Sequence, residues 1–396
     1  MNWGLRGAAR SRQGKNHLSA REMVTEAVTG CLGRAGMTAD QVGAVVMSNN
    51  GSYWDGQPSV AAQSWLYPLE LGHVQVYNVE NACAGGGTAM HLGTTLLEVG
   101  RGPVLVVGVE RMYIPDKALV ALRAELSPKE IVMGIIEGGI NESLREELKQ
   151  EYANDFGSVF MGLNASWARS QVADRGHTPE QAAAAASKAR HNALLSGNAR
   201  LMAELSAEDV MRSPIVDDPI RRSMCGPYSD GAAAALLTAD APSDRPRIAA
   251  SEYTSGDGTG EAHGRMELMS GKIWAELGLD PRDVDVVEVH DASSFEELWA
   301  LEACGFYDVG GAGTATLAGE TSLDGRQPVN AGGGLVGRGH PISATGVLQV
   351  VELYEQLTGQ AGERQVPGAS IAFAENQGGL SGYADAAGLA MHVLRI

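Results

Sequence analysis

The feature of this sequence that most restricts its fold is a regular alternation of short apolar runs and helical patterns. The apolar runs are rich in β-branched residues and have the length of buried strands: Val42–Met47, His73–Val79, Pro103–Val109, Ala232–Thr238, Val284–Val289 and Ala369–Ala374. Helical patterns alternate with them: Ser19–Ala35, Gly85–Glu98, Met266–Leu277, Ser294–Ala303 and Ser343–Leu357. This alternation is typical of layered α/β proteins with a parallel or mixed sheet.

The order of these elements is repeated in outline in the two halves of the 396-residue chain. In the first half a strand leads into Cys83, a helix and a further strand. In the second half a strand ends at His290 and is followed by a helix and the strand Ala369–Ala374. The segment Ala241–Arg247, rich in Pro, Asp and Ser, is the best boundary. We predict one half over residues 1–240 and a second over 241–396.

The pattern changes over residues 111–222, where helical stretches replace the strands. Glu142–Ala153 is a charged helical stretch with Asn141 as a plausible N-cap, and Pro179–Leu195 is rich in alanine. We interpret this region as a helical cap inserted in the first half, which arches over the site and shapes substrate access. A purely structural insertion explains the pattern about as well.

Composition excludes several classes of protein. The net charge of −18 argues against nucleic acid as a partner, since phosphate binding requires concentrated Lys and Arg. The four cysteines show neither a close pair nor zinc spacing, so no metal site is predicted, and scattered thiols fit a reducing compartment. The segment Met1–Ser19 lacks the apolar stretch of a secretory signal, and no run is long enough to cross a bilayer. We expect a soluble cytoplasmic protein without a membrane partner.

Cys83 lies where the strand His73–Val79 gives way to a helical pattern, and it is followed by the glycines 85–87. At a helix N-terminus the dipole and free N–H groups favour a thiolate, with pKa values of roughly 3.5–7.5 in comparable sites. Three glycines destabilise a helix, so close approach of an acyl group or of neighbouring backbone is the natural reason for them. A buried core cysteine beside a packing turn is the alternative.

Two histidines lie in similar positions in the second half. His290 ends an apolar strand and precedes a helix whose N-cap is Ser293 or Ser294, with Glu296 or Glu297 near the capping-box position. Ligands collect at the carboxyl ends of such strands, although a lone histidine there is more often structural. His340 stands between glycines at the mouth of a helix, a context that suits a reacting anion, or it only braces the turn.

The segment Asn376–Gly379 follows the last apolar strand. Glycine N–H groups in such a turn can point into a site and serve as oxyanion donors. A tight turn that closes a hairpin with Tyr383–Leu394 is the other reading. The remaining cysteines, Cys31, Cys225 and Cys304, are expected to be packed side chains.

Together these segments resemble the thiolase superfamily, and most closely its sterol-carrier-protein (nonspecific lipid-transfer) thiolase branch. The matching segments lie in the family's order across nearly the whole chain: Asn81–Gly87, Cys225–Ala234, Val289–Asp291, Asn330–Leu335, Gly339–Gly346 and Gly362–Gly368. The resemblance implies two similar α/β halves in a five-layer α/β/α/β/α arrangement, usually as a homodimer. It also implies a CoA thioester as substrate and no bound cofactor.

The resemblance implies a role for each matched residue. Cys83 would become the acyl-thioester and His340 would activate it as a base. His290 would polarise the thioester carbonyl of the second substrate. The N–H groups of Cys83 and Gly379 would form the oxyanion hole.

Three departures from the family pattern matter. The residue after His-Asp, usually a cysteine that removes a proton from acetyl-CoA, is Ala292 here. The Cys-x-Gly turn of other thiolases is replaced by Asn376–Gly379. Because alanine cannot transfer protons, ordinary acetyl-CoA condensation comes into doubt. The N-terminus, beginning Met1–Gly7, leaves little room for the family's first strand.

The set Cys83–His290–His340 also resembles that of elongating β-ketoacyl synthases, in which decarboxylation generates the carbanion. We predict an acyltransferase that loads an acyl group from CoA or a carrier protein onto Cys83. Transfer to a second substrate follows, by decarboxylative C–C bond formation or simple acyl transfer. One alternative is a retro-aldolase that acts on a β-hydroxyacyl-CoA beside an OB-fold, acyl-CoA-binding partner. A second is a non-catalytic lipid- or acyl-CoA-binding homologue.

Overall fold

The computed structural model describes residues 2–52, 59–113, 159–197, 203–240, 242–257, 262–379 and 386–396. Within them the main sheet has nine strands in the order β3-β2-β4-β7-β1-β8-β11-β10-β9. In chain order these strands are β1 (Trp3–Arg10), β2 (Ala44–Ser48), β3 (Gln75–Val79), β4 (Val104–Glu110), β7 (Gly231–Thr238), β8 (Arg247–Ser255), β9 (Val286–Glu288), β10 (Ile371–Gly378) and β11 (Gly388–Arg395).

Each half of the chain supplies one side of this sheet. Strands β3, β2 and β4 are parallel to one another. Strand β7 is antiparallel to β4, and β1 is antiparallel to β7. The second half contributes β8, β11, β10 and β9, of which β10 and β9 are parallel. The halves join where Trp3 and Gly4 of β1 pair with Ile248 and Arg247 of β8.

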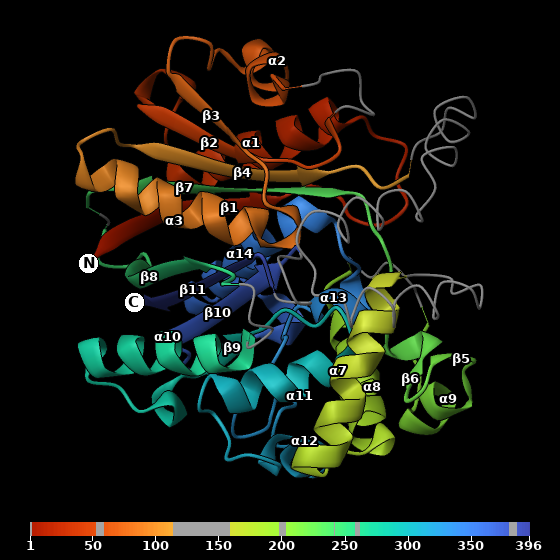
Figure 1. Ribbon diagram of the computed structural model, residues 1–396. Coiled ribbons are helices and arrows are strands. Elements are labelled where there is room, and N and C mark those ends of the chain that lie inside the picture. Colours follow the sequence, from red (N-terminus) through yellow and green to blue (C-terminus); the bar gives the residue numbers. More distant parts are fainter. Residues whose placement is uncertain are drawn as a thin grey trace.

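Helices form three layers around and between the two halves of the sheet (Figure 1). Helices α1 (Ala20–Ala35) and α2 (Ala61–Leu66) cover the outer face of the first half. Helices α3 (Gly85–Glu98) and α14 (Thr345–Leu357) lie between the halves, in the central core. Helices α10 (Ala262–Leu277) and α11 (Ser294–Ala303) cover the outer face of the second half. The predicted five-layer arrangement is therefore confirmed.

The expectation of a short N-terminus without the first strand is wrong. Residues Trp3–Arg10 form β1, which pairs with β7 along most of its length and with β8 at its start. The segment lacks the β-branched residues that mark the other strands, because its buried positions include Leu5, Ala8 and Ala9, none of which is branched at Cβ. Pairing on both sides overrides their low strand propensity. Strands β8 and β11 were also not among the six expected runs.

The inserted region forms a helical group beside the second half. Its described elements are α7 (Val159–Arg175), α8 (Pro179–Leu195), α9 (Ala207–Arg212), β5 (Ile215–Asp217) and β6 (Ile220–Arg221). Helix α8 packs against α11, α12 (Gly311–Leu317) and α13 (Gly334–Arg338), the helix that leads to His340. The expected helix at Glu142–Ala153 lies outside the described residues, so the cap's effect on access stays a prediction.

Glycines before His340 face this cap. A Cβ on Gly333 would lie 2.4 Å from Cβ of Ala193, and one on Gly337 would lie 2.1 Å from the carbonyl oxygen of Ala189. These two glycines allow α8 to pack closely on α13.

Candidate active site

Cys83 lies on a short 3₁₀ turn, Ala82–Ala84, between β3 and α3. The turn is strained, since Ala82 has a φ of 45°, in the left-handed region that side chains other than glycine rarely adopt. Neighbouring backbone approaches on two sides. A Cβ on Gly86 would lie 2.7 Å from the amide nitrogen of Gly346, and one on Gly378 would lie 2.3 Å from Cβ of Cys83. The glycines around Cys83 therefore serve close backbone approach, one of the two reasons that the sequence suggested.

His340 faces the sulfur of Cys83. Its Nε2 lies 3.1 Å from Sγ, and its Nδ1 lies 2.8 Å from Oγ1 of Thr345. The Thr345 hydroxyl donates its one proton to the carbonyl of Pro341 at 3.2 Å, so it can only accept from the ring. The proton of a neutral His340 ring is thereby held on Nδ1. Nε2 is left as an acceptor for the Cys83 thiol, which is the arrangement that a general base needs.

His290 is held in the opposite tautomer by Asn376. The amide oxygen of Asn376 accepts from the N–H of Gly87 at 3.0 Å, which fixes the orientation of the amide. Its Nδ2 then donates to the carbonyl of Cys83 at 3.1 Å and to Nδ1 of His290 at 3.3 Å. Because Nδ1 accepts, the ring proton of His290 is on Nε2. His290 is thus prepared to donate a hydrogen bond, whereas His340 is prepared to accept one.

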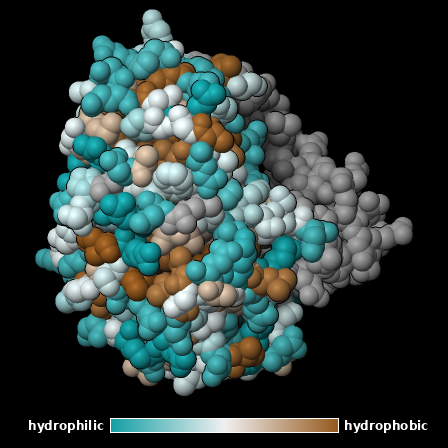
Figure 2. Space-filling model, turned by 90° about the vertical axis from the view of Figure 1, so that its left-hand side faces the viewer, coloured by the Kyte–Doolittle hydropathy of each residue, from teal (hydrophilic) through white to brown (hydrophobic). Residues whose placement is uncertain are grey.

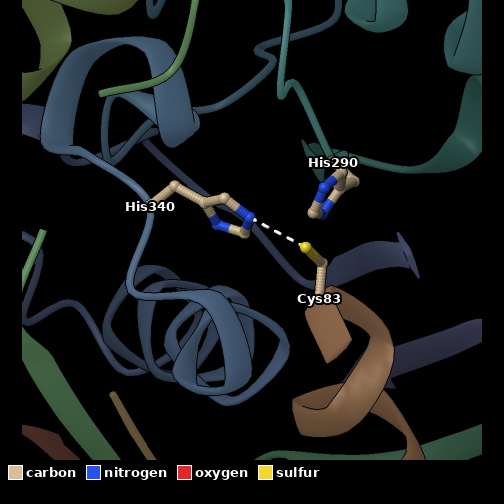
Figure 3. Close-up of side chains that lie close together, drawn as sticks. All are labelled: Cys83, His290 and His340. Atoms are coloured by element: carbon tan, nitrogen blue, oxygen red, sulfur yellow. Dashed lines mark hydrogen bonds between the residues drawn. The ribbon is translucent and has the colours of Figure 1, made fainter. Parts of the chain in front are cut away.

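The structure brings the three predicted site residues together, as Figure 3 shows. The rings of His290 and His340 are nearly perpendicular, at 82°, with centroids 5.2 Å apart. One nitrogen of each ring and Sγ of Cys83 all lie within 4.8 Å of one another. Both histidines are buried, and Cys83 as a residue is half-buried. Three segments that are far apart in the chain therefore converge on one sulfur atom.

The expected oxyanion donors also lie at this sulfur. The N–H groups of Gly379 and of Cys83 itself donate to Sγ and lower its pKa. Gly379 has a φ of 73°, which glycine adopts without strain. Strand β10 extends to Gly378 and pairs with β11 in antiparallel fashion, while the N–H of Gly379 reaches Cys83, so its role as an oxyanion donor stays a prediction.

The expectation that Cys83 rests as a thiolate is wrong. Burial raises the pKa of Cys83 to about 12, and the negative charges of Glu296 and Glu110 act in the same direction. The backbone donors at the helix start do not outweigh this burial. The resting nucleophile is a neutral thiol, so it must lose its proton to His340 during the attack and not before it.

Both histidines rest neutral as well. Burial lowers the pKa of His290 to about 3, and the positive charge of Arg338 adds to the shift. Burial also holds the pKa of His340 well below its usual range, with smaller contributions from His290 and Arg338. A neutral imidazole has the free lone pair that a base requires, so His340 remains competent far into the acid range.

Buried carboxyl groups surround the site and are protonated more readily than usual. Burial raises the pKa of Glu296 to about 8, although the N–H groups of Ser293 and Ala292 oppose the shift. Burial raises the pKa of Glu375 to about 8 and that of Glu110 to about 7. Glu296 also forms the expected capping box with Ser293 at the start of α11. Near neutral pH much of this acidic shell is uncharged.

Residue 292, at which the expected second cysteine is missing, is partly exposed to solvent. Ala292 is half-buried beside Ser293, which pairs with Cys225 in an isolated bridge. Sγ of Cys225 donates to the carbonyl of Arg221 at 3.5 Å, and the residue packs against the cap. Cys31 and Cys304 are fully buried in the core.

Sequence reasoning missed the two residues that orient the histidines. Thr345 follows His340 by five residues at the start of α14, and the helical turn between them returns its hydroxyl to the ring. That spacing was readable in the sequence. The amide of Asn376 could not have been assigned to His290, because only the pairing of β9 with β10 brings them together.

Comparison with known proteins identifies the family. Residues 5–197 match the family model described as "Thiolase, N-terminal domain", and residues 269–389 match "Thiolase C-terminal domain-like". The chain is 32% identical to an acetyl-CoA acetyltransferase of Methanothermobacter thermautotrophicus, over 93% of each chain. It is 30% identical to "Non-specific lipid-transfer protein-like 2" of Caenorhabditis elegans, over 90% of this chain and 87% of that protein.

Solved structures agree on the fold. The "Ltp2-ChsH2(DUF35) aldolase" has a TM-score of 0.76 at 20% identity and covers 100% of this chain and 97% of its own. The Acat5 thiolase of Ascaris suum in complex with coenzyme A has a TM-score of 0.67 at 16% identity and covers 100% of both chains. The predicted resemblance is confirmed by sequence and structure alike: the chain belongs to the thiolase family of acyltransferases.

Proposed function

We propose that this protein accepts an acyl group from a CoA or carrier-protein thioester on Sγ of Cys83 and transfers it to a second substrate. The observation that carries the proposal is the 3.1 Å contact between Sγ of Cys83 and Nε2 of His340, with the His340 proton held on the other nitrogen by Thr345. A thiol that faces the lone pair of a neutral imidazole has the geometry of an activated nucleophile.

In the first step Sγ attacks the thioester carbonyl while the thiol proton passes to Nε2 of His340. The carbonyl oxygen becomes negative and accepts from the N–H groups of Cys83 and Gly379, a role supported by the approach of both groups to Sγ. The bond from carbon to the sulfur of CoA then breaks, and that sulfur takes the proton from His340. The products are the Cys83 acyl-thioester, free CoA and neutral His340.

In the second step the acyl group leaves Cys83 for an acceptor. The Nε2–H of His290 supplies a hydrogen bond to the acceptor's thioester oxygen, where an enolate would develop charge. Ala292 provides no group to remove an α-proton. We therefore propose that the carbanion arises by decarboxylation of a malonyl-type thioester, or that the acceptor is an alcohol, amine or thiol that needs no carbanion.

Mass spectrometry of the intact protein after incubation with a panel of acyl- and malonyl-CoAs tests this proposal. We expect a mass increase equal to the acyl group in the wild type and none in Cys83→Ala. Cys225→Ala is the matched control, because its half-buried thiol does not belong to the group formed by Cys83, His290 and His340, and it should label normally. Labelling that survives in Cys83→Ala would discard the proposal.

A retro-aldolase that works with an OB-fold partner is the second candidate. The missing cysteine at position 292 favours it, and the aldolase complex among the structural neighbours has the same fold. The retained Cys83 counts against it, because carbon–carbon cleavage of a β-hydroxyacyl thioester needs no acyl-enzyme. Cleavage that persists in Cys83→Ala, with a co-purifying small subunit, would establish this candidate in place of the first.

We also propose that the protein is a homodimer of the cytoplasm. Strand β3 lies at the edge of the sheet, with Gln75, Tyr77 and Asn78 exposed, and an open strand edge invites pairing with a second copy.

The cytoplasmic location is supported by the cysteines. All four are unpaired thiols, which fits a reducing compartment. None of the described helices is long and apolar enough to cross a membrane, and the face in Figure 2 mixes hydrophilic side chains with small hydrophobic groups. The homodimer is tested by light scattering, which should give twice the mass of one chain.

A further inference from the structure

The three side chains of the proposed acyl-transfer site also form a possible set of metal ligands. Sγ of Cys83 and one ring nitrogen each of His290 and His340 lie within 4.8 Å of one another. Across the part of the chain that the structure describes, this is the one group of three or more His, Cys, Asp or Glu side chains close enough to share an ion. Thiolate and imidazole are the donors that zinc prefers in proteins.

We propose that Cys83, His290 and His340 bind one Zn²⁺ ion and that the bound ion blocks the acyl-transfer site. Binding of the ion depends on these three side chains alone, whereas the block rests on the proposed acyl transfer. Three protein ligands leave a fourth tetrahedral position, which water fills. The attacking electron pair of the sulfur is then bonded to the metal and cannot reach a thioester.

The separations suit a tetrahedral ion. Typical Zn–S and Zn–N bonds of about 2.3 Å and about 2.0 Å place a sulfur and a nitrogen ligand about 3.5 Å apart. Nε2 of His340 is 3.1 Å from Sγ of Cys83, so the pair must open by only a few tenths of an ångström. The third donor lies within 4.8 Å of the other two and must approach them more closely to share the ion.

Neighbouring groups orient the ligands. Metal-binding histidines usually donate their second ring N–H to a protein oxygen, and Nδ1 of His340 already does so to Thr345. His290 is less well prepared, because Asn376 donates to its Nδ1 and the ring proton is on Nε2. For ligation through Nε2 the proton moves to Nδ1 and the hydrogen bond from Asn376 is lost, which costs about tenfold in affinity.

The proton balance of binding is distinctive. The S–H bond of Cys83 breaks, the Zn–S bond forms, and one proton leaves to the solvent. Each histidine binds through the lone pair of one ring nitrogen.

The test is a titration of the purified protein with Zn²⁺ against a chromogenic chelator. We expect one ion per chain and at least about a hundredfold loss of affinity in Cys83→Ala. Cys225→Ala should bind as the wild type does. Affinity that is unchanged in Cys83→Ala would overturn the proposal.

A second measurement needs no substitution. Zn²⁺ should slow the alkylation of Cys83 by iodoacetamide, EDTA should restore the rate, and Mg²⁺ should have no effect because it prefers oxygen ligands. His290→Gln should weaken this protection. Alkylation at an unchanged rate in saturating Zn²⁺ contradicts the site. Neither measurement uses an acyl donor. The result on zinc binding is therefore independent of whether the protein transfers acyl groups.

Discussion

Thr345 accepts a hydrogen bond from Nδ1 of His340 at 2.8 Å, and its own proton is directed to the carbonyl of Pro341. The hydroxyl therefore decides which nitrogen of His340 carries the proton, and with it whether the ring can act as a base toward Cys83. Asn376 does the reverse for His290. One site thus contains two neutral imidazoles of opposite function, set by one hydroxyl and one amide.

Thr345→Val should therefore slow the acylation of Cys83. Valine keeps the shape of threonine but cannot accept from Nδ1, so His340 is free to place its proton on Nε2, where it faces the thiol. We expect a fall of about 10–100-fold in the single-turnover rate, measured by mass spectrometry after rapid quenching. Thr345→Ser retains the acceptor and should keep most of the rate. Equal rates in all three proteins would show that the tautomer is not controlled here.

Asn376→Asp should impair transfer more than acylation. The carboxylate can still accept from the N–H of Gly87, but it no longer donates to Nδ1 of His290. The ring proton then moves toward Nδ1, and the donor that faces the acceptor's carbonyl is lost. Removal of one such donor costs about 10²–10³ in rate. The two half-reactions, followed separately from pre-acylated enzyme, would show the selective loss, and an equal loss in both would contradict it.

The raised pKa of Cys83 predicts the absence of thiolate at neutral pH. With a thiol pKa of about 12, the ultraviolet absorbance of thiolate should not develop between about pH 6 and pH 9. The difference spectrum between the wild type and Cys83→Ala isolates this residue from the other thiols. A titration step of one thiolate near pH 7, as expected for a resting ion pair of sulfur and imidazole, would contradict the neutral site.

The three residues of the site could be predicted from the sequence because each stands at the end of a helix or strand. Cys83, His290 and His340 each follow a strand or precede a helix, and glycine-rich segments mark two of them. Their protonation was not predictable. The helix start near Cys83 suggested a thiolate, but the burial that overrides it arises from packing between two halves of the chain.

The fold shows a similar limit. Runs such as Val104–Glu110 reveal themselves because β-branched residues point to both faces of a buried strand. Strand β1 does not, because its neighbours β7 and β8, far away in sequence, supply the hydrogen bonds that its own residues favour only weakly. Contacts of this kind become visible only when the sheet is assembled.

Stability should fall as pH rises through the range in which the buried carboxyls titrate. Burial raises the pKa of Glu375 from 4.5 to about 8. Above the unfolded value the unfolded chain has lost this proton while the folded protein keeps it, so the unfolded state binds fewer protons and the free energy of unfolding decreases with pH. The slope is about 1.4 kcal/mol per pH unit for each such group.

Glu375→Gln should remove this contribution, because glutamine does not titrate. Urea unfolding at about pH 5 and about pH 7.5 gives the two free energies of unfolding whose difference is compared between variant and wild type. We expect a smaller decrease with pH in the variant. Asp280→Asn offers a control. Asp280 is exposed and paired with Arg282, and its pKa of about 2 means that it does not titrate between these two pH values. Equal decreases in the wild type and in Glu375→Gln would mean that Glu375 is ionised in the folded protein.

Ala292→Cys should add the proton transfer that this chain lacks. The side chain at 292 is half-buried and follows His290 by two residues, so the substitution introduces a thiol near the end of the strand that carries His290. Exchange of the α-hydrogens of acetyl-CoA with deuterium from the solvent, followed by mass spectrometry, reports such a base directly. We expect slow exchange in the wild type and an increase of about 10²-fold or more in Ala292→Cys, whereas Ala292→Ser, a far weaker acid, should resemble the wild type. Fast exchange already in the wild type would mean that another group removes the proton, and the decarboxylative route would then lose its support.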